Sequence, residues 1–277
     1  MSLERIPLAG VIGSPIAHSK SPALHMHWLK SLGIAGHYIP MDIAQDDLAD
    51  VIRMLPRMGF VGVNVTVPYK EAVIELADLV TDRAALIGSA NTLIFRKDGK
   101  IHADNTDGYG FIQNLRQKAP DWNPKAGPTV VLGAGGAARA VIAALNDAGV
   151  PEILITNRTK QRAEALKKDF GKRLRVVDWV QAGNILEEAA TVVNTTSLGM
   201  IGKPPLRVPL DGLQKGALVT DLVYAPLRTH LLNEAEKAGC VTVDGLGMLL
   251  HQAVPAFERW FGVRPQVTEE TRAAVLR

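Results

Sequence analysis

Residues Val130–Arg139 read VVLGAGGAAR, in which a short apolar strand leads into a glycine-rich turn and the start of a helix. Glycine allows a tight turn and lets backbone N–H groups approach a pyrophosphate, while the helix N-terminus adds partial positive charge. A second strand, expected at Glu152–Thr156, follows at the spacing of a strand–helix–strand unit. The pattern predicts a dinucleotide-binding turn, with a ligand-free turn between packed elements as the alternative.

The residues after that second strand indicate which dinucleotide is bound. NAD sites usually place Asp or Glu there, where the carboxylate accepts a hydrogen bond from the ribose 2′-hydroxyl. This chain has Asn157-Arg158-Thr159, followed by Arg162. A guanidinium pairs with a 2′-phosphate, which a carboxylate repels. We therefore expect NADP; the alternative is that the two arginines are exposed residues at a helix start.

On both sides of this turn, short apolar segments alternate with helix-length segments, which is typical of an α/β protein. Ser21 is expected to be the N-cap of a helix with Pro22 at its first position. Ala119–Pro128 is rich in proline and is a candidate domain junction. The other expected strands are Leu8–Ile12, His37–Ile43, Val61–Val67, the hairpin of Asn91–Phe95 and Ile101–Ala103, Thr129–Leu132 and Val241–Val243. The expected helices run from Ser21 to about Leu32, from Asp46 to Met58, from the glycine turn to Ala148 with Gly149 as cap, and from about Leu246 to Phe261.

Length and composition exclude several classes of protein. The 277 residues suffice for one large or two ordinary domains, and 47% hydrophobic with 21% charged residues indicates a globular chain. The single cysteine, Cys240, excludes an internal disulfide and a cysteine zinc site, and it suits a reducing compartment. Met1–Arg5 lacks the apolar run of a signal peptide, and no apolar stretch approaches the ~18 residues of a membrane span. We therefore expect a cytoplasmic protein with no membrane partner.

The charge pattern gives no reason to expect nucleic acid. The net charge is +3, basic and acidic residues are interspersed, and the four tryptophans are scattered rather than clustered as a stacking surface. His25 and His27 point to different sides of a helix, so we expect no metal site.

Four polar clusters lie beside expected strand ends in the N-terminal part of the chain. Singly, each suits a helix cap, a turn or an exposed surface. Together they supply hydroxyl and amide groups, a cation and a carboxylate, as a polyhydroxylated substrate requires. The clusters are Ser14–Pro22 (SPIAHSKSP), Asn64–Lys70 (NVTVPYK), Asn91-Thr92, and Asp104–Gly108 (DNTDG).

With these clusters and the glycine turn, the sequence resembles the shikimate dehydrogenase family. The matching motifs occur in the family's order and span about residues 10–252. They are Gly13–Pro22, Asn64–Lys70, Asn91-Thr92, Asp104–Gly108, Gly133–Gly136, Asn157–Thr159, Asp221–Tyr224 (DLVY) and Asp244–Leu249 (DGLGML).

The resemblance implies NADP-dependent, reversible reduction of 3-dehydroshikimate to shikimate in the pathway to chorismate and the aromatic amino acids. It implies that Ser19, Ser21 and Tyr224 lie at the substrate carboxylate, and that Thr66, Asn91, Asp107 and Gln252 hold ring hydroxyls, with Lys70 at the reacting oxygen. The cofactor-binding residues that we expect are Gly133, Ala134, Gly135, Gly136, Ala137, Asn157, Arg158, Thr159, Arg162, Thr195, Thr196, Gly245 and Met248.

The resemblance also implies two α/β domains. Residues 1–107 are expected to form a substrate-binding and catalytic domain, completed by C-terminal helices within residues 246–277. Residues 108–245 are expected to form a Rossmann-type NADP-binding domain. The oligomeric state is left open, with a homodimer as one alternative.

Reduction of a ketone needs a proton for the developing alkoxide, and hydride transfer belongs to the nicotinamide. Lys70 and Asp107 are the expected catalytic pair; a water relay is the alternative proton donor. Two rival functions are a quinate/shikimate dehydrogenase with wider substrate or NAD use, and a catalytically silent regulatory protein that binds NADP or shikimate.

Overall fold

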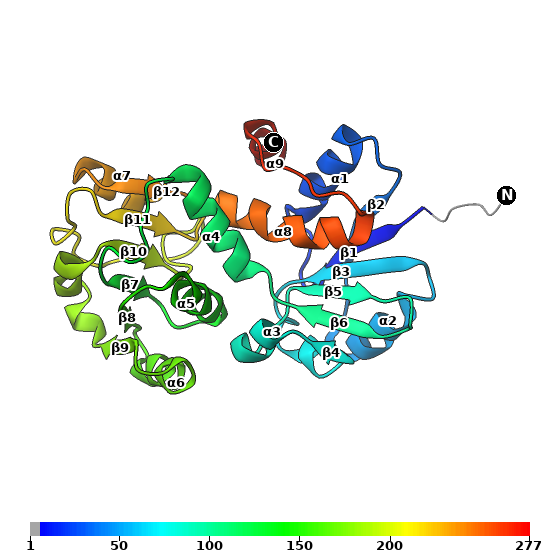
Figure 1. Cartoon of the computed structure of the whole chain (residues 1–277), viewed down its shortest axis with the longest axis horizontal. Helices are drawn as coiled ribbons and strands as arrows, with labels where there is room; N and C mark the ends of the chain where they lie inside the picture. Colours follow the sequence, from blue (N-terminus) through cyan, green and yellow to red (C-terminus); the bar gives the residue numbers. More distant parts are fainter. Residues whose placement is uncertain (1–5) are drawn as a thin grey trace. The chain divides into compact units, whose positions relative to one another are not determined.

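The computed structural model describes residues 6–277, which form two compact units (Figure 1). The first unit comprises residues 6–106 together with Leu250–Arg277, and the second comprises Asp107–Leu249. The chain thus leaves the first unit once and returns to it at its C-terminal end. The expectation of a leaderless N-terminus rests on Met1–Arg5, which lie outside the described residues.

The first unit is built on a six-stranded mixed sheet in the order β2-β1-β3-β5-β6-β4. β1, β2 and β3 are parallel, and β5 and β6 form an antiparallel hairpin beside β3. The strands are β1 (Leu8–Gly13), β2 (His37–Asp42), β3 (Phe60–Val65), β4 (Leu79–Val80), β5 (Thr92–Phe95) and β6 (Ile101–Asp104). The helices are α1 (Ser21–Ser31), α2 (Leu48–Met54), α3 (Asp82–Ile87), α9 (Glu269–Leu276) and the part of α8 (Leu246–Phe261) from residue 250 onward.

Aromatic residues of α1 and α8 pack on one side of the first unit's core. Trp260 lies against β3 so closely that a Cβ on Gly62 would stand 2.0 Å from the indole Nε1. His25 stacks on Tyr38 with ring centroids 3.9 Å apart and lies edge-on to Trp28. These rings bury α1, β2 and the C-terminal part of α8 together, which is why that last segment belongs to the first unit.

Two of the expected elements in the first unit differ from the structure. The helix expected over Asp46–Met58 is a 3₁₀ turn followed by α2, which ends at Met54. Pro56 disfavours helix at the residue before it and would clash with the carbonyl four residues back, so the helix stops there. Ser21 is not the N-cap but the first residue of α1. The backbone N–H of Ser21 donates to Ser19 Oγ at 3.3 Å.

The second unit is a six-stranded sheet in which every pairing is parallel, in the order β9-β8-β7-β10-β11-β12. Numbered within the unit, this is the order 3-2-1-4-5-6 of the doubly wound Rossmann topology. The strands are β7 (Thr129–Leu132), β8 (Ile153–Thr156), β9 (Leu174–Val177), β10 (Thr191–Asn194), β11 (Leu218–Asp221) and β12 (Val241–Val243). The main helices are α4 (Asp107–Lys118), α5 (Gly136–Ala148), α6 (Lys160–Phe170) and α7 (His230–Lys237).

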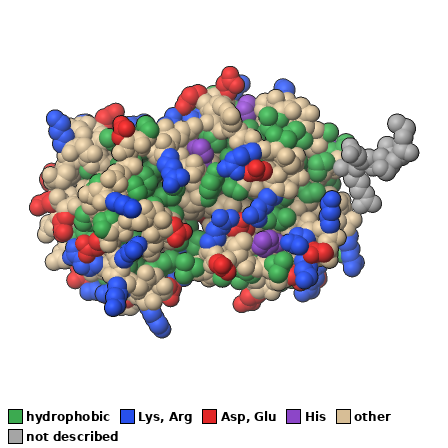
Figure 2. Space-filling model, viewed as in Figure 1, with side chains coloured by type: hydrophobic (Ala, Val, Ile, Leu, Met, Phe, Trp, Pro, Cys, Tyr) green, Lys and Arg blue, Asp and Glu red, His purple; other side chains and the backbone are tan. Residues whose placement is uncertain are grey.

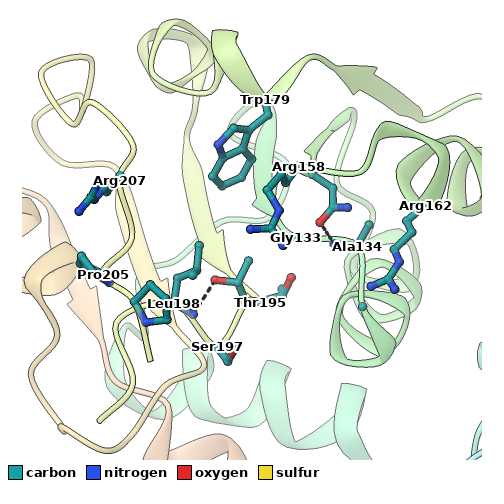
Figure 3. Close-up of a pocket in the computed structure, with 14 residues that line it drawn as sticks. Gly133, Ala134, Arg158, Arg162, Trp179, Thr195, Ser197, Leu198, Pro205 and Arg207 are labelled. Atoms are coloured by element: carbon teal, nitrogen blue, oxygen red, sulfur yellow. Dashed lines mark hydrogen bonds between the residues drawn. The ribbon is translucent and has the colours of Figure 1, made fainter. Parts of the chain in front are cut away.

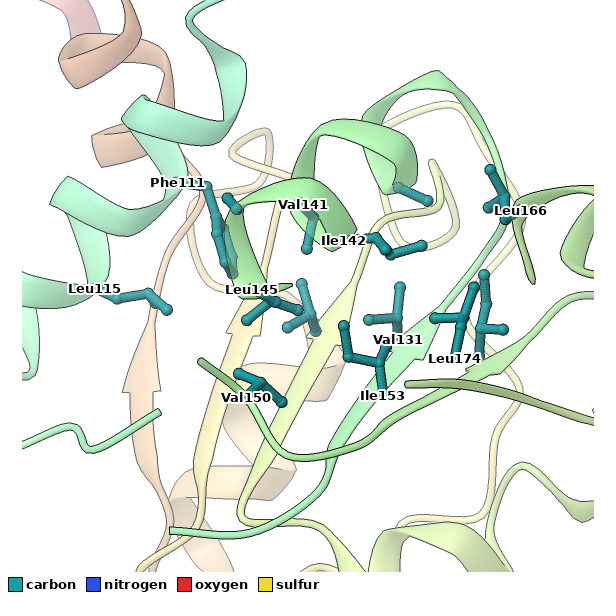
Figure 4. Packing of buried hydrophobic residues seen from close by; sticks show 14 of the residues in the cluster. Phe111, Leu115, Val131, Val141, Ile142, Leu145, Val150, Ile153, Leu166 and Leu174 are labelled. Atoms are coloured by element: carbon teal, nitrogen blue, oxygen red, sulfur yellow. The ribbon is translucent and has the colours of Figure 1, made fainter. Parts of the chain in front are cut away.

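The core of the second unit lies between the central strands and the helices that cover one face of the sheet (Figure 4). Val131 and Ile153 of the sheet meet Val141 and Leu145 of α5, all with no exposed surface. α5 ends as expected at Gly149, which adopts φ +85°. The loop Ala119–Pro128 lies inside this unit and is not a domain junction.

The charged surface agrees with the interspersed sequence pattern. Figure 2 shows lysine and arginine side chains among aspartate and glutamate side chains over the visible face. No helix within residues 6–277 combines the length and the apolar composition needed to cross a bilayer.

Candidate active site

A cavity of about 680 Å³ opens at the carboxyl ends of β7, β8 and β10 in the second unit. This is the edge where the strand order reverses, between β7 and β10, and dinucleotides bind at such switch points. The lining residues are Gly133, Ala134, Gly135, Asn157, Arg158, Arg162, Trp179, Thr195, Thr196, Ser197, Leu198, Pro204, Pro205 and Arg207 (Figure 3).

The glycine turn forms the floor of this cavity. Gly133 has φ +105°, and a Cβ there would lie 2.7 Å from Thr196 Cγ2 and 2.8 Å from Thr195 Oγ1. Gly135 precedes the first turn of α5, and apart from Gly135 and its two chain neighbours no residue has an atom within 4 Å of the place its Cβ would take. The turn is therefore tight at Gly133 and open at Gly135, which leaves room for a phosphate at the helix N-terminus.

The end of β8 supplies positive charge and no carboxylate. Arg158 and Arg162 are exposed at the cavity, and Arg207 reaches its rim from the loop after β10. Asn157 holds this segment to the turn: its Oδ1 accepts the Ala134 N–H at 3.2 Å, and its Nδ2 donates to the Thr159 carbonyl at 2.8 Å. The local charge favours a phosphorylated ribose.

The end of β10 is fixed by a buried network. Asn194 Oδ1 accepts from the backbone N–H of Thr196 at 3.0 Å and from its hydroxyl at 2.7 Å, and Asn194 Nδ2 donates to Asp221 at 2.9 Å. Thr229 and the Val223 N–H also donate to Asp221. Burial raises the pKa of the Asp221 carboxyl, although these three donors lower it in part. The network holds the loop of Thr195 and Thr196 against the cavity.

Five expected cofactor residues of the second unit do not line the cavity. Gly136 and Ala137 form the first turn of α5, Thr159 precedes α6, and Gly245 lies against the Leu222 carbonyl. Met248 packs on the hydrophobic core of the unit.

The first unit brings most of the expected substrate-binding residues to the ends of β1, β3 and β5. Asn91 Nδ2 donates to Gln252 Oε1 at 2.9 Å, although 161 positions separate the two residues. Asn91 Oδ1 accepts from the Thr92 hydroxyl and from the backbone N–H and hydroxyl of Thr106. All of these side chains are buried, so the two amides are held in fixed orientations.

Asn64 and Tyr38 extend this network, and the sequence assigns neither of them an individual role. Asn64 Nδ2 donates to the Asn91 carbonyl and the Thr92 hydroxyl, and its Oδ1 accepts from the Tyr38 hydroxyl at 2.7 Å. Asn64 lies in a quoted motif, but only the fold shows that its partner comes from β2.

Ser19, Thr66 and Lys70 lie on loops that follow β1 and β3 in the first unit, and Ser21 is the first residue of α1. Ser19 and Ser21 flank the start of α1, and the Thr66 N–H bonds to the Ile12 carbonyl at 2.9 Å. The Lys70 carbonyl accepts the Ala90 N–H at 2.7 Å, which links its loop to the one before β5.

Asp107 and Tyr224 belong to the second unit. Asp107 is the first residue of α4, and Tyr224 follows β11, where burial raises the pKa of its hydroxyl. Within the described residues, no group of His, Cys, Asp and Glu side chains could hold a metal ion.

Asp104 shares a motif with Asp107 but has a structural role. It is buried, its Oδ1 accepts from Arg83 Nε at 2.6 Å and from Thr81 at 2.9 Å, and Arg259 lies 3.5 Å from its Oδ2. Burial raises its pKa, but hydrogen bonds and charge from Arg83 outweigh this and hold it below its usual value.

The cavity fits NADP: an open helix N-terminus suits a pyrophosphate, and two guanidiniums suit a 2′-phosphate. Its topology and lining define a dinucleotide-binding protein of the doubly wound α/β class.

Comparison with known proteins narrows this class. Residues 11–93 match the family model of the shikimate dehydrogenase substrate binding domain, residues 115–201 that of shikimate / quinate 5-dehydrogenase, and residues 245–276 that of the shikimate 5′-dehydrogenase C-terminal domain. The chain belongs to the shikimate dehydrogenase family, as the motifs predicted.

Individual curated relatives and solved structures support the same family. A shikimate dehydrogenase (NADP(+)) of Cereibacter sphaeroides is 75% identical over 272 residues, 98% of each chain. Among solved structures, quinate dehydrogenase from Corynebacterium glutamicum in complex with NAD has a TM-score of 0.91 at 33% identity, covering 98% of this chain and 99% of that one. Shikimate 5-dehydrogenase from Thermus thermophilus in complex with NADP(H) and shikimate has a TM-score of 0.86 at 39% identity, with the same coverage.

Proposed function

We propose that this chain catalyses the NADP-dependent, reversible reduction of 3-dehydroshikimate to shikimate in the pathway to chorismate and the aromatic amino acids. The observation that carries the proposal is the pair Arg158 and Arg162 at the cavity, in a chain 75% identical to an NADP(+) shikimate dehydrogenase. The substrate domain is the first unit, and the cofactor domain is the second.

The cofactor is held by the residues of the cavity. The glycine turn and the N-terminus of α5 bind the pyrophosphate, Arg158 and Arg162 bind the 2′-phosphate, and the loop of Thr195 and Thr196 borders the nicotinamide half. When bound, NADPH supplies the hydride. The open space at Gly135 supports this assignment.

The substrate is held by the polar groups of the first unit, and Asp107 and Tyr224 are the further substrate-binding candidates from the sequence motifs. Ser19, Ser21 and Tyr224 bind the carboxylate, while Thr66, Asn91, Asp107 and Gln252 bind the ring hydroxyls. The fixed amides of Asn91 and Gln252 support this role, because oriented donors and acceptors discriminate between hydroxyl patterns.

Lys70 stabilises the developing alkoxide and delivers its proton at the carbonyl oxygen, and Asp107 is the second member of the proposed catalytic pair. An ammonium can do both because it is a point charge with three donors. A water relay remains the alternative route for the proton.

A second candidate is quinate/shikimate dehydrogenase activity with NAD. It is favoured by the likeness to the quinate dehydrogenase structure. The described residues at the end of β8 include no carboxylate, the usual acceptor for the 2′-hydroxyl of NAD, and this opposes the use of NAD. Steady-state rates with each substrate and each cofactor separate the two candidates.

We further propose that the enzyme works in the cytoplasm without nucleic acid or membrane partners; its single cysteine and interspersed charges support this. Light scattering during size exclusion would distinguish a monomer from a homodimer.

A further inference from the structure

Trp179 gives the cofactor cavity an aromatic wall that no sequence motif indicated. It begins the 3₁₀ turn after β9 and is the only aromatic residue among the described residues that line the cavity. One part of its side chain packs against the buried cluster that contains Leu132, Leu154 and Val177. The indole is therefore held by the core and still presents a surface to the ligand space.

The segment that carries Trp179 is joined to the segment that carries the arginines. Asp178, directly before Trp179, forms an ion pair with Lys160 at the start of α6, with Nζ and Oδ1 2.7 Å apart. In Figure 3 the indole and the Arg158 side chain extend to the same part of the cavity. An exposed pair adds little stability, but it shows that the two loops meet here.

The covalent order of NADP places a base beside these residues. The pyrophosphate belongs at the glycine turn, and the 2′-phosphate belongs at Arg158 and Arg162. The 2′-phosphate and the adenine are carried by the same ribose, so the adenine lies within one sugar of the arginines. Trp179 offers the π surface that a purine needs at that point.

We propose that the Trp179 indole stacks on the adenine ring of the cofactor and is a determinant of cofactor affinity. The inference rests on the proposed use of NADP. One stacking contact is enough to place the adenine, because other groups bind the phosphates of the cofactor. Since the adenine takes no part in hydride transfer, the stacking contributes equally before and during the reaction, so its loss raises KM and leaves kcat unchanged.

The test uses 2′,5′-ADP, which contains the adenine and the 2′-phosphate but no nicotinamide. Binding is followed by tryptophan fluorescence and by calorimetry, with wild type, Trp179→Leu and Trp179→Phe. The matched control is Trp122→Phe in the same unit, whose indole N–H bonds to Thr191 at 3.0 Å away from the cavity. Thermal unfolding of each variant shows whether it is folded.

We expect 2′,5′-ADP to quench wild-type fluorescence and to lose roughly 5- to 150-fold in affinity in Trp179→Leu, the range for loss of one base–aromatic stack. Trp179→Phe retains most of the affinity but loses the quench, and Trp122→Phe retains both. The inference is overturned if Trp179→Leu binds within twofold of wild type, or if the quench persists in Trp179→Phe. If wild type does not bind 2′,5′-ADP at all, the proposed cofactor is wrong and the inference falls with it.

Discussion

We expect cofactor choice to depend most directly on Arg158, which lines the cavity. Replacing it in Arg158→Gln removes a charged donor from the 2′-phosphate but nothing from NAD, which has a hydroxyl there. We expect KM for NADP to rise roughly tenfold or more, the range for loss of a hydrogen bond to a charged group, while rates with NAD stay unchanged. Steady-state kinetics with both cofactors measures this.

Arg173→Gln is the control, because Arg173 is an exposed arginine of the same unit and does not line the cavity. An equal loss with NADP and NAD in Arg158→Gln would mean that the residue supports the fold and not the phosphate.

Lys70 is the residue assigned to the reacting oxygen. In Lys70→Ala we expect kcat to fall by on the order of 10²–10⁴ because general-acid assistance and charge stabilisation are lost together. The affinity for NADP, measured by fluorescence titration, changes much less. Lys97→Ala in the exposed hairpin turn of the first unit is the control. A near-normal kcat in Lys70→Ala would remove the assignment.

Sequence reasoning at this scale found residues that carry a motif and missed their partners. Arg158 was identifiable because its position after a strand has a chemical meaning. Tyr38, Asn64 and Trp179 were not, because each acts through a contact with a residue distant in sequence. Asp104 shows the same limit: nothing in its motif distinguishes an ion-paired structural carboxylate from the neighbouring Asp107.

The glycine turn is the element that joins fold and function, and its glycines have different roles. Gly133→Ala places a Cβ against Thr195 and Thr196 at φ +105°, so we expect the free energy of unfolding to fall by roughly 1–3 kcal/mol. Gly135→Ala meets no chain atom and keeps the wild-type stability, but it fills the phosphate cradle and raises KM for NADP roughly tenfold. Chemical denaturation and kinetics on both variants measure the contrast. A stable Gly135→Ala with normal KM would show that no phosphate binds there.

The helices and strands that could be predicted are those whose own residues show a clear apolar pattern or a glycine stop. β7, α5 with its Gly149 cap, β12 and α8 lie where the apolar periodicity and the glycines indicated. The helix predicted over Asp46–Met58, with Gly59 as its stop, was too long because Pro56 ends α2 at Met54. β4 has only two residues, too few to show a sequence pattern of their own. It is a strand because it pairs in parallel with β6.

On the scale of the whole molecule, buried histidines make stability depend on pH. His25 has no exposed surface and its ring nitrogens have no hydrogen-bond partner, so burial lowers its pKa from 6.5 to about 3, although the Asn64 side chain opposes the shift in part. Below pH 6.5 the His25 imidazole therefore binds a proton in the unfolded chain but not in the folded chain. The free energy of unfolding falls as the pH drops.

We expect this group alone to lower the free energy of unfolding by about 2 kcal/mol between pH 7 and pH 5. Denaturation at several pH values should show the slope, which His25→Phe reduces by one proton and His37→Gln, at an exposed position of β2, leaves unchanged. An unchanged slope in His25→Phe would show that His25 does not titrate between the folded and unfolded states.

The discontinuous first unit was accessible only by resemblance, because no local pattern says that residues 250–277 return to a domain begun at the N-terminus. Burial of His25, Trp28 and Trp260 together is the physical reason for that return.

The most direct test of the account is the initial rate of nicotinamide reduction with purified protein, in a two-by-two comparison of shikimate or quinate with NADP or NAD. We predict that shikimate with NADP exceeds every other pair in kcat/KM by roughly tenfold or more, because NAD lacks the phosphate that pairs with the arginines and quinate adds a hydroxyl at the carbon that bears the carboxylate. Comparable turnover with NAD or quinate, or no turnover in any pair, would contradict it.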